Sequence, residues 1–314
     1  MTKNNTTWLL VAALLISVGF NFYQAGDNND SKYPFLAKRL FAENQNDIVI
    51  NFNPLRESLR AYPAANGLNM GIYFEYLPSG TSIGVNEKEI FFSASLIKIP
   101  VVMRTYRLIE EGSLRADQEV TVEQKFIDKN FGTLWEKGPG AKVTVNELIV
   151  KTLTESDSTA YNILGDITQS HEKTEGGTRL TSDVYNYLDI PFDRIGNQYG
   201  ISPKAFGSVL RSLYLSAYLP YQTSNHILEL MSQSTFKKWL PEPIPQDVKV
   251  AHKYGVYVGD ISAQLVHSDC GIVYYPKRPY LLCVMINTGD KMVAEQNIRA
   301  VSKLAFDFVK SVNQ

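Results

Sequence analysis

The order of strand-like and helix-like patterns is the feature that most constrains the fold of this chain. A helix pattern, NPLRESLRAY, with Asn53 as its expected cap and Pro54 at its first position, precedes two alternating runs around residues 78–80 that predict a hairpin. Helical patterns fill residues 93–239, and strand patterns return after residue 245 as DVKVAHKY, SAQLVHSDCGIVYY and RPYLLCVMIN, followed by a closing helix, NIRAVSKLAFDFVKSV. This order predicts an α+β fold: a five-stranded antiparallel sheet with flanking helices, built by both chain ends, and an inserted all-helical domain.

The N-terminus carries an export pattern. Lys3 precedes a nearly uninterrupted apolar run over residues 8–22, and the polar stretch GDNNDSK follows it. A cleavable signal peptide has small residues at positions -3 and -1, whereas a cut after Ala25 would place Tyr23 at -3. We therefore expect an uncleaved anchor in the cell membrane, with the body of the protein extracytoplasmic; the alternative is secretion after cleavage.

The N-terminal pattern and the order of helix and strand patterns together predict how the chain is organised. Residues 1–25 are expected to form the signal anchor and residues 26–32 a linker, and a single domain is expected from residue 33 to residue 314. Within that domain, residues 33–92 and 245–314 are expected to form the α/β part, and residues 93–244 the helical part.

Composition excludes some functions. The chain has 314 residues, 44% of them apolar, which is enough for a sizeable core. Its formal net charge is -1 and it has no basic block, so no nucleic-acid partner is expected.

Metal and cofactor binding are not expected either. Two cysteines, Cys270 and Cys283, cannot form a cysteine zinc cage. In a hairpin turning near residues 276–279 they would sit diagonally on neighbouring strands, which favours two buried thiols over a disulfide. His252 and His267 lack metal-ligand spacing, so we expect strand-end histidines with ordinary partners rather than metal ligands or a general base.

Ser-x-x-Lys tetrads suggest nucleophilic chemistry, because residues three apart share a helical face. The chain contains three such pairs: Ser95 with Lys98, Ser170 with Lys173, and Ser234 with Lys237. The first lies where the strand-like EIFF meets a long amphipathic helix, so its serine is expected at a helix N-terminus, which favours an oxyanion. The second lies in a polar loop and the third at an expected solvated helix end. Pro100 inside the first helix is expected to kink it.

Two further motifs follow in order. Ser156-Asp157-Ser158 lies between two helix patterns, and Lys253-Tyr254-Gly255 opens the returning strands. With these motifs the sequence resembles the penicillin-recognising serine enzymes, above all the class A β-lactamases, whose signature is S-x-x-K, S-D-N and K-T-G. The resemblance runs from about residue 68 to the C-terminus and includes TVNELIVKTLTESDSTAYNIL and SPKAFGSVLRSLYL. It implies a β-lactamase/transpeptidase-like fold.

The resemblance implies a role for each matching residue. Ser95 would be the nucleophile, Lys98 its base, and Ser156 the relay that carries a proton to the leaving nitrogen. Lys253 would attract the substrate carboxylate, and the backbone N–H groups of Ser95 and Val256 would form the oxyanion hole.

The motifs also depart from the family pattern. Ser158, a substrate-binding position, replaces asparagine and removes an amide that would contact the substrate. Tyr254 replaces threonine before Gly255, and its ring is expected to carry the hydroxyl outward from the carboxylate position. Asp157 is expected to hold its neighbouring loop rather than to contact substrate.

The largest departure lies over residues 183–203, where class A enzymes carry E-x-x-L-N. This stretch contains no glutamate, and its carboxylates are Asp183, Asp189 and Asp193. We expect a serine acyl-hydrolase that acts on β-lactams without a cofactor. The missing glutamate keeps two alternatives open: a D-alanyl-D-alanine peptidase or related cell-wall hydrolase, which acts on a D-Ala-D-Ala-type peptide, and a penicillin-binding or sensor protein that deacylates slowly.

Overall fold

The computed structural model describes residues 50–171, 182–191, 193–195, 198–258 and 265–312. The expected anchor and linker lie outside these described residues. Within the described part, no helix combines the length and the apolar character needed to cross a membrane.

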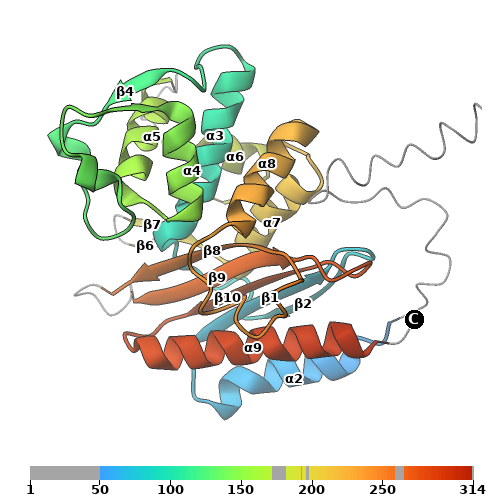
Figure 1. Ribbon diagram of the computed structural model, residues 1–314. Coiled ribbons are helices and arrows are strands. Elements are labelled where there is room, and N and C mark those ends of the chain that lie inside the picture. The colour runs from blue at the N-terminus through green and yellow to red at the C-terminus, as the bar shows by residue number, and fades with distance from the viewer. Residues whose placement is uncertain (1–49, 172–181, 192, 196–197, 259–264, 313–314) are drawn as a thin grey trace, which may run out of the picture. The chain divides into compact units, whose positions relative to one another are not determined.

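One five-stranded antiparallel sheet organises the described chain (Figure 1). Its strands are β1 (Met70–Tyr76), β2 (Thr81–Val85), β8 (Val250–Tyr257), β9 (Val266–Val273) and β10 (Tyr280–Ile286). They lie in the order β2-β1-β10-β9-β8, so β8 forms one edge. The pairing of β1 with β10, from Met70 opposite Ile286 to Tyr76 opposite Tyr280, joins the two ends of the chain as the sequence predicted.

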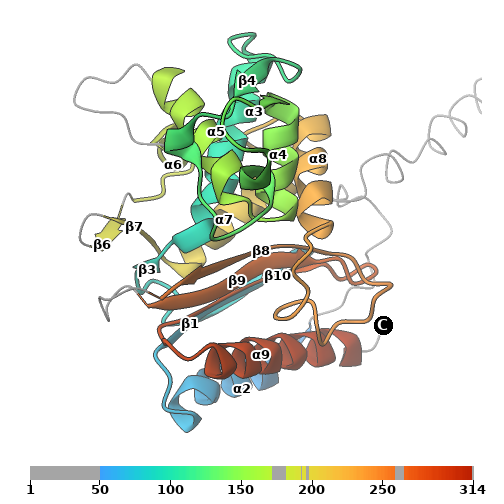
Figure 2. The same ribbon diagram turned by 60° about the vertical axis from the view of Figure 1, so that its left-hand side comes forward.

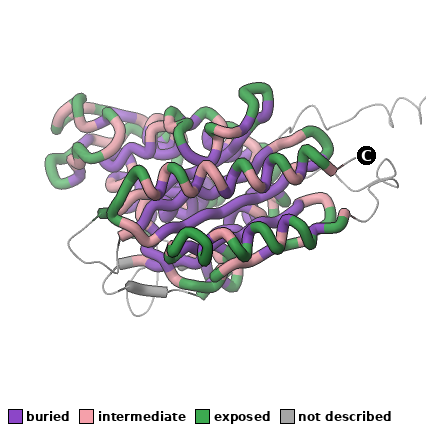
Figure 3. The backbone as a smooth tube through the Cα atoms, turned by 90° about the horizontal axis from the view of Figure 1, so that it is seen from below, coloured by how far each residue is buried: buried purple, intermediate pink, exposed green. Residues whose placement is uncertain are grey.

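Both faces of the sheet are covered, so even the polar residues of its central strands are buried. Every residue of β1, β9 and β10 is buried. Helices α2 (Asn53–Ala65) and α9 (Lys291–Ser311) cover one face, and the inserted region covers the other (Figures 1 and 2). Seen from below, the central strands are buried while the outer sides of the helices are exposed (Figure 3). The prediction of an α+β fold built from both chain ends is confirmed.

The two covering helices begin at positions other than those expected. Asn53 is the first helical residue of α2 rather than its cap, and its N–H donates to the side chain of Asn51. Helix α9 begins earlier than its apolar pattern, because the Asp290 side chain caps it by accepting from the N–H groups of Met292 and Val293.

The inserted region is mainly helical. Its α-helices are α3 (Lys98–Glu110), α4 (Val145–Thr154), α5 (Ser158–His171), α6 (Ser182–Tyr187), α7 (Pro203–Tyr214) and α8 (Tyr221–Ser232). The Thr144 hydroxyl accepts from the N–H of Glu147 at 3.1 Å, which caps α4.

Short elements connect these helices. The 3₁₀ helices are η2 (Ala94–Ile97), η3 (Gln124–Phe126) and η4 (Leu134–Lys137). The short strands are β3 (Phe91–Phe92), β4 (Glu119–Thr121), β5 (Lys142–Thr144), β6 (Asp193–Ile195) and β7 (Gln198–Ile201). Strand β3 pairs with β7, which brings the end of the loop without a glutamate beside the segment that precedes Ser95.

The prediction of two free thiols is wrong, because Cys270 and Cys283 form a disulfide. Residues 274–279 connect β9 to β10 and place Val273 opposite Tyr280. In this register Cys270 is directly opposite Cys283 rather than diagonal to it, so both sulfurs lie on the same face of the sheet.

Candidate active site

Ser95 lies in the 3₁₀ turn η2, immediately before α3. The turn begins at Ala94, which has a left-handed backbone with φ of 43°. Ser95 is partly exposed, and its hydroxyl has no hydrogen-bond partner among the described residues. Pro100 falls in the first turn of α3, where an N–H has no partner within that helix, so the kink expected at this proline has no cause.

Lys98 is buried one helical turn after Ser95, with 3% of its surface exposed. Its Nζ donates to the carbonyl oxygen of Ser156 at 2.5 Å, to the Ser156 hydroxyl at 3.2 Å and to the Ser158 hydroxyl at 3.4 Å. Burial lowers the pKa of Lys98 to about 8, and the negative charges of Asp157 and Asp128 partly oppose this effect. A neutral, proton-accepting lysine is therefore accessible near neutral pH.

Lys253, on the edge strand β8, reaches the same hydroxyl from the other side. It is 1% exposed, and its Nζ donates to the Ser156 hydroxyl at 2.8 Å and to the carbonyl oxygen of Tyr254 at 2.7 Å. Burial and the positive charge of Lys98 hold the pKa of Lys253 well below its ordinary value, while Asp269 acts in the opposite direction. The Ser156 hydroxyl thus lies between two buried amines.

The turn that carries Ser156 is fixed by Asp157. Ser156 has a left-handed backbone with φ of 57°. The Asp157 carboxylate accepts from the N–H of Ala160 at 2.8 Å, which caps α5, and from the N–H of Leu134 at 2.7 Å. These contacts tie the loop before η4 to the site, as expected of a residue that holds its neighbouring loop.

Strand β8 passes directly against the nucleophile turn. A Cβ added at Gly255 would lie 3.3 Å from the backbone nitrogen of Ser95, 3.3 Å from the Cβ of Ala94 and 2.9 Å from the hydroxyl of Ser268. Only glycine allows this approach without displacement. Val256 follows on the same edge strand, so the two expected oxyanion donors lie on adjoining segments.

Tyr254 does not point outward, contrary to the expectation. Only 9% of the residue is exposed. Its ring stacks on Phe236 with centroids 4.1 Å apart and meets the edge of Trp239 at 6.2 Å. The Nζ of Lys253 lies 4.3 Å from the centroid of the same ring. The segment FKKWL supplies the apolar surface that holds the ring inward, and its two aromatic residues belong to no motif that predicts this role.

The loop after α5 supplies no described carboxylate to the site. Asp183 accepts from the Tyr218 hydroxyl at 2.5 Å and forms an ion pair with Arg104 at 3.4 Å. Asp189 is exposed. The side chain of Asp193 lies outside the described residues.

The two strand histidines have local partners. His252 Nδ1 lies 2.8 Å from Asp269 Oδ1 with both residues fully buried, and His267 Nδ1 lies 3.0 Å from the carbonyl oxygen of Thr288. No group of three His, Cys, Asp or Glu side chains in the described part of the chain could hold a metal ion. Sequence reasoning missed Asp269, which binds His252 and also accepts from the N–H of Leu240 at 3.0 Å.

Of the other two Ser-x-x-Lys pairs, only Ser234 with Lys237 lies wholly within the described residues. The Ser170 hydroxyl donates to the carbonyl oxygen of Ile167, and Lys173 lies outside the described residues. Lys237 donates to the carbonyl oxygen of Ser232 rather than to Ser234.

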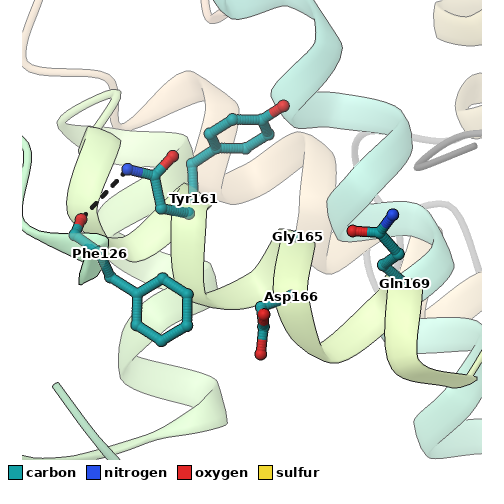
Figure 4. Close-up of a pocket in the computed structure, with 6 residues that line it drawn as sticks. Phe126, Tyr161, Gly165, Asp166 and Gln169 are labelled. Carbon is teal, nitrogen blue, oxygen red and sulfur yellow. Dashed lines mark hydrogen bonds between the residues drawn. The ribbon is translucent and has the colours of Figure 1, made fainter. Parts of the chain in front are cut away.

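A separate cavity of about 180 Å³ opens beside α5 (Figure 4). Its lining residues come from α5 and the end of η3: Phe126, Tyr161, Asn162, Gly165, Asp166 and Gln169. The Tyr161 ring lies 5.6 Å from the Nζ of Lys98, so this residue borders both the cavity and the active site.

The chain is similar in sequence to known β-lactamases. The family model described as "Beta-lactamase enzyme family" matches residues 54–309. "Beta-lactamase 3" of Bacillus cereus is 24% identical over 257 residues, which cover 78% of each chain. "Beta-lactamase" of Streptomyces lavendulae is 24% identical, over 79% of this chain and 83% of that protein.

Solved structures share the fold. "Structure of PBP-A" superposes with a TM-score of 0.73 at 21% identity and covers 83% of this chain and 97% of that chain. "Crystal structure of TLA-3 extended-spectrum beta-lactamase" superposes with a TM-score of 0.73 at 19% identity, over 82% and 99%. Since the family model spans most of the chain and the fold agrees, this protein belongs to the beta-lactamase enzyme family and is a serine hydrolase.

Proposed function

We propose that this protein opens β-lactam rings by forming an acyl-enzyme on Ser95 and then hydrolyses that intermediate. One observation supports the proposal above all others: the Ser156 hydroxyl lies between two buried lysines, 3.2 Å from Lys98 and 2.8 Å from Lys253. The family match and the names of the curated relatives point to the same substrate class.

The proposed acylation uses Lys98, Ser95 and Ser156 in turn. Neutral Lys98 accepts the proton of Ser95, whose oxygen forms a bond to the lactam carbonyl carbon. The bond from that carbon to the lactam nitrogen breaks, and the nitrogen takes the proton of the Ser156 hydroxyl. Lys98 then returns its proton to Ser156 across the 3.2 Å hydrogen bond. No leaving group departs, because the opened ring stays attached to the acyl group.

Charge in the transition state is stabilised where β8 meets the nucleophile turn. The N–H of Ser95 and the neighbouring edge strand offer donors to the developing oxyanion, and each such donor is typically worth a few kcal/mol. Lys253 is the amine proposed to attract a substrate carboxylate.

Deacylation needs a base for water, and residues 183–203 contain no glutamate. Lys98, with its lowered pKa, is the base that the described site provides. We expect hydrolysis of the acyl-enzyme to be slower than its formation. A structural relative, a single-residue mutant of PBP-A, was solved as an "Acyl-enzyme complex with penicillin-G" and so carries such an intermediate.

The proposed location is outside the cytoplasm, anchored to the cell membrane by residues 1–25, with residues 33–314 as the catalytic domain. The apolar run over residues 8–22 after Lys3 supports this location. Cell fractionation tests it: the full chain should sediment with membranes and keep its N-terminal mass, whereas a soluble, shortened chain would indicate cleavage.

Intact-protein mass spectrometry with a penicillin tests the proposed reaction. The wild type should gain the mass of one whole penicillin on Ser95 and then return to its original mass. Ser95→Ala and Lys98→Ala should gain nothing, whereas the control Lys237→Ala should react like the wild type. If the wild type forms no adduct, the proposal is wrong.

The same time course separates the alternatives. An adduct that persists for hours would indicate a penicillin-binding protein rather than a β-lactam hydrolase. Release of D-alanine from a D-Ala-D-Ala peptide, together with a persistent penicillin adduct, would assign the protein to the cell-wall peptidases.

A further inference from the structure

The N–H of Val256 is directed toward the open edge of the sheet. The Gly255 carbonyl oxygen accepts from the Ser268 hydroxyl of the neighbouring strand β9 at 3.3 Å, and the two residues lie directly opposite each other. That carbonyl and the N–H of Val256 belong to one peptide unit, which is planar and trans, so the two groups point in opposite directions. Since β8 is an edge strand and β9 is its neighbour, the N–H of Val256 points away from the sheet.

The backbone of Ser95 lies against the same stretch of β8. A Cβ added at Gly255 would lie 3.3 Å from the Ser95 nitrogen, so the two segments meet without a side chain between them. This approach lets the N–H groups of Ser95 and Val256 serve one oxyanion. Glycine has no side chain with which to pack, however, so it permits the approach without holding the segments together. A contact between neighbouring side chains is therefore needed to fix their separation.

An aromatic pair joins the two segments beside this approach. Phe92 ends β3, three residues before Ser95, and Tyr257 ends β8, directly after Val256. The two ring centroids lie 4.6 Å apart, within the range of about 4.5–7 Å at which aromatic pairs attract each other. Phe92 is buried, and it is held from its other side by its pairing opposite Gly200 of β7. The pair thus ties the end of β8 to the strand that leads into the nucleophile turn.

We propose that Phe92 and Tyr257 are positioning residues that fix the spacing between the two oxyanion donors, the N–H groups of Ser95 and Val256. Donors held in place stabilise a developing charge without having to reorganise when it appears. The inference rests on the proposed function, because the charge develops during acylation of Ser95. Neither ring contacts the substrate, and both act through the backbone that they hold.

Single-turnover acylation by a penicillin tests this role in Tyr257→Leu, which removes the ring and keeps an apolar side chain. The acylation rate at saturating penicillin should fall about 10-fold, less than the loss of about 100-fold or more that follows complete removal of an oxyanion donor. The penicillin concentration for half-saturation should stay within about twofold of the wild type, because the affected interaction forms in the transition state. Tyr257→Phe keeps the ring and should acylate like the wild type.

Phenylboronic acid reports on the oxyanion donors directly, through its inhibition of acylation. The Ser95 oxygen forms a bond to boron, the proton of Ser95 passes to Lys98, and no group leaves, so the adduct is a tetrahedral anion like the acylation intermediate. The affinity of such an analogue follows the stabilisation of the transition state. In Tyr257→Leu it should fall by the same factor as the acylation rate. An unchanged affinity would overturn the proposal.

Phe92→Leu and the double variant complete a double-mutant cycle. If the rings act as a pair, the double variant should be no slower than either single variant, whereas multiplied losses would mean that the rings act separately and would contradict the proposal. Tyr275→Leu is the matched control, because Tyr275 is also half-buried and packs on a buried phenylalanine, Phe306, with ring centroids 5.7 Å apart. Phe306 belongs to α9, on the other face of the sheet, so Tyr275→Leu should lower the melting temperature and acylate like the wild type.

The outcomes distinguish the two proposals. If the wild type is acylated and Tyr257→Leu reacts at the same saturated rate, the positioning role is wrong. A change confined to the half-saturating concentration would make Tyr257 a substrate contact, and an equal loss of rate in Tyr275→Leu would make the effect one of general stability; either result would overturn the role. If the wild type itself is not acylated, the proposed function fails instead.

Discussion

Replacing Lys98 with methionine should stabilise the protein while it abolishes acylation. The two side chains are similar in length and apolar volume, so the buried space stays filled. Folding lowers the pKa of Lys98 from 10.5 to about 8, and a pKa difference of one corresponds to about 1.4 kcal/mol. At pH 7 the wild type therefore loses about 3 kcal/mol by burying this amine, and the variant does not.

The sign of this effect sets its pH dependence. Between pH 8 and 10.5 the unfolded chain binds one proton more at Lys98 than the folded chain does. The free energy of unfolding of the wild type therefore rises with pH across this window. Lys98→Met lacks this rise. The excess of its free energy of unfolding over that of the wild type should therefore shrink by about 2 kcal/mol between pH 7 and pH 9.5.

Urea unfolding of both proteins at pH 7 and at pH 9.5 measures the difference. Lys303→Met is the control, because the exposed Lys303 is paired with Asp307 and should show a small difference at both pH values. A difference for Lys98→Met that does not change with pH, or a variant less stable than the wild type at pH 7, would refute the reasoning.

Three further predictions concern the site and the sheet. The single-turnover acylation rate should rise about tenfold from pH 7 to pH 9 and then level off, because Lys98, with its pKa of about 8, loses its proton over this range; a flat profile would exclude it as the base. Gly255→Ala should lower acylation by about tenfold in the same assay, since its Cβ would lie 3.3 Å from the Ser95 nitrogen and would displace the nucleophile turn. The double change Cys270→Ala and Cys283→Ala should lower the free energy of unfolding by about 3 kcal/mol in urea, given the separation of 13 residues that the disulfide closes.

The sequence predicted the parts of the fold and site that depend on local spacing. Ser95 and Lys98 are three residues apart, across the 3₁₀ turn η2 and the start of α3, so their closeness in space follows from local helical spacing. Ser156 and Lys253 could be added because their motifs stand at element boundaries in a known order. In the structure, the Ser156 hydroxyl lies within hydrogen-bond distance of both Lys98 and Lys253.

The features that could not be predicted depend on partners far along the chain. The inward ring of Tyr254 is set by Phe236, which lies in an irregular segment without periodicity. The disulfide depends on strand register, and an error of two residues in register converts a direct pair into a diagonal one. The position of Pro100 also depends on η2. Because η2 ends at Ile97, the α-helix begins at Lys98 and Pro100 falls in its first turn, where proline is tolerated.

The antiparallel pairing of β1 with β10 connects residues 70 and 286, and Lys253 reaches Ser156 only from the returning strands. Contacts over such sequence separations form late and cannot form on a nascent chain whose last strands are still unsynthesised. A covalent penicillin adduct would therefore mark only molecules that have completed their folding. Labelling with a penicillin at successive times during refolding or translation would therefore measure how fast the molecules complete their folding.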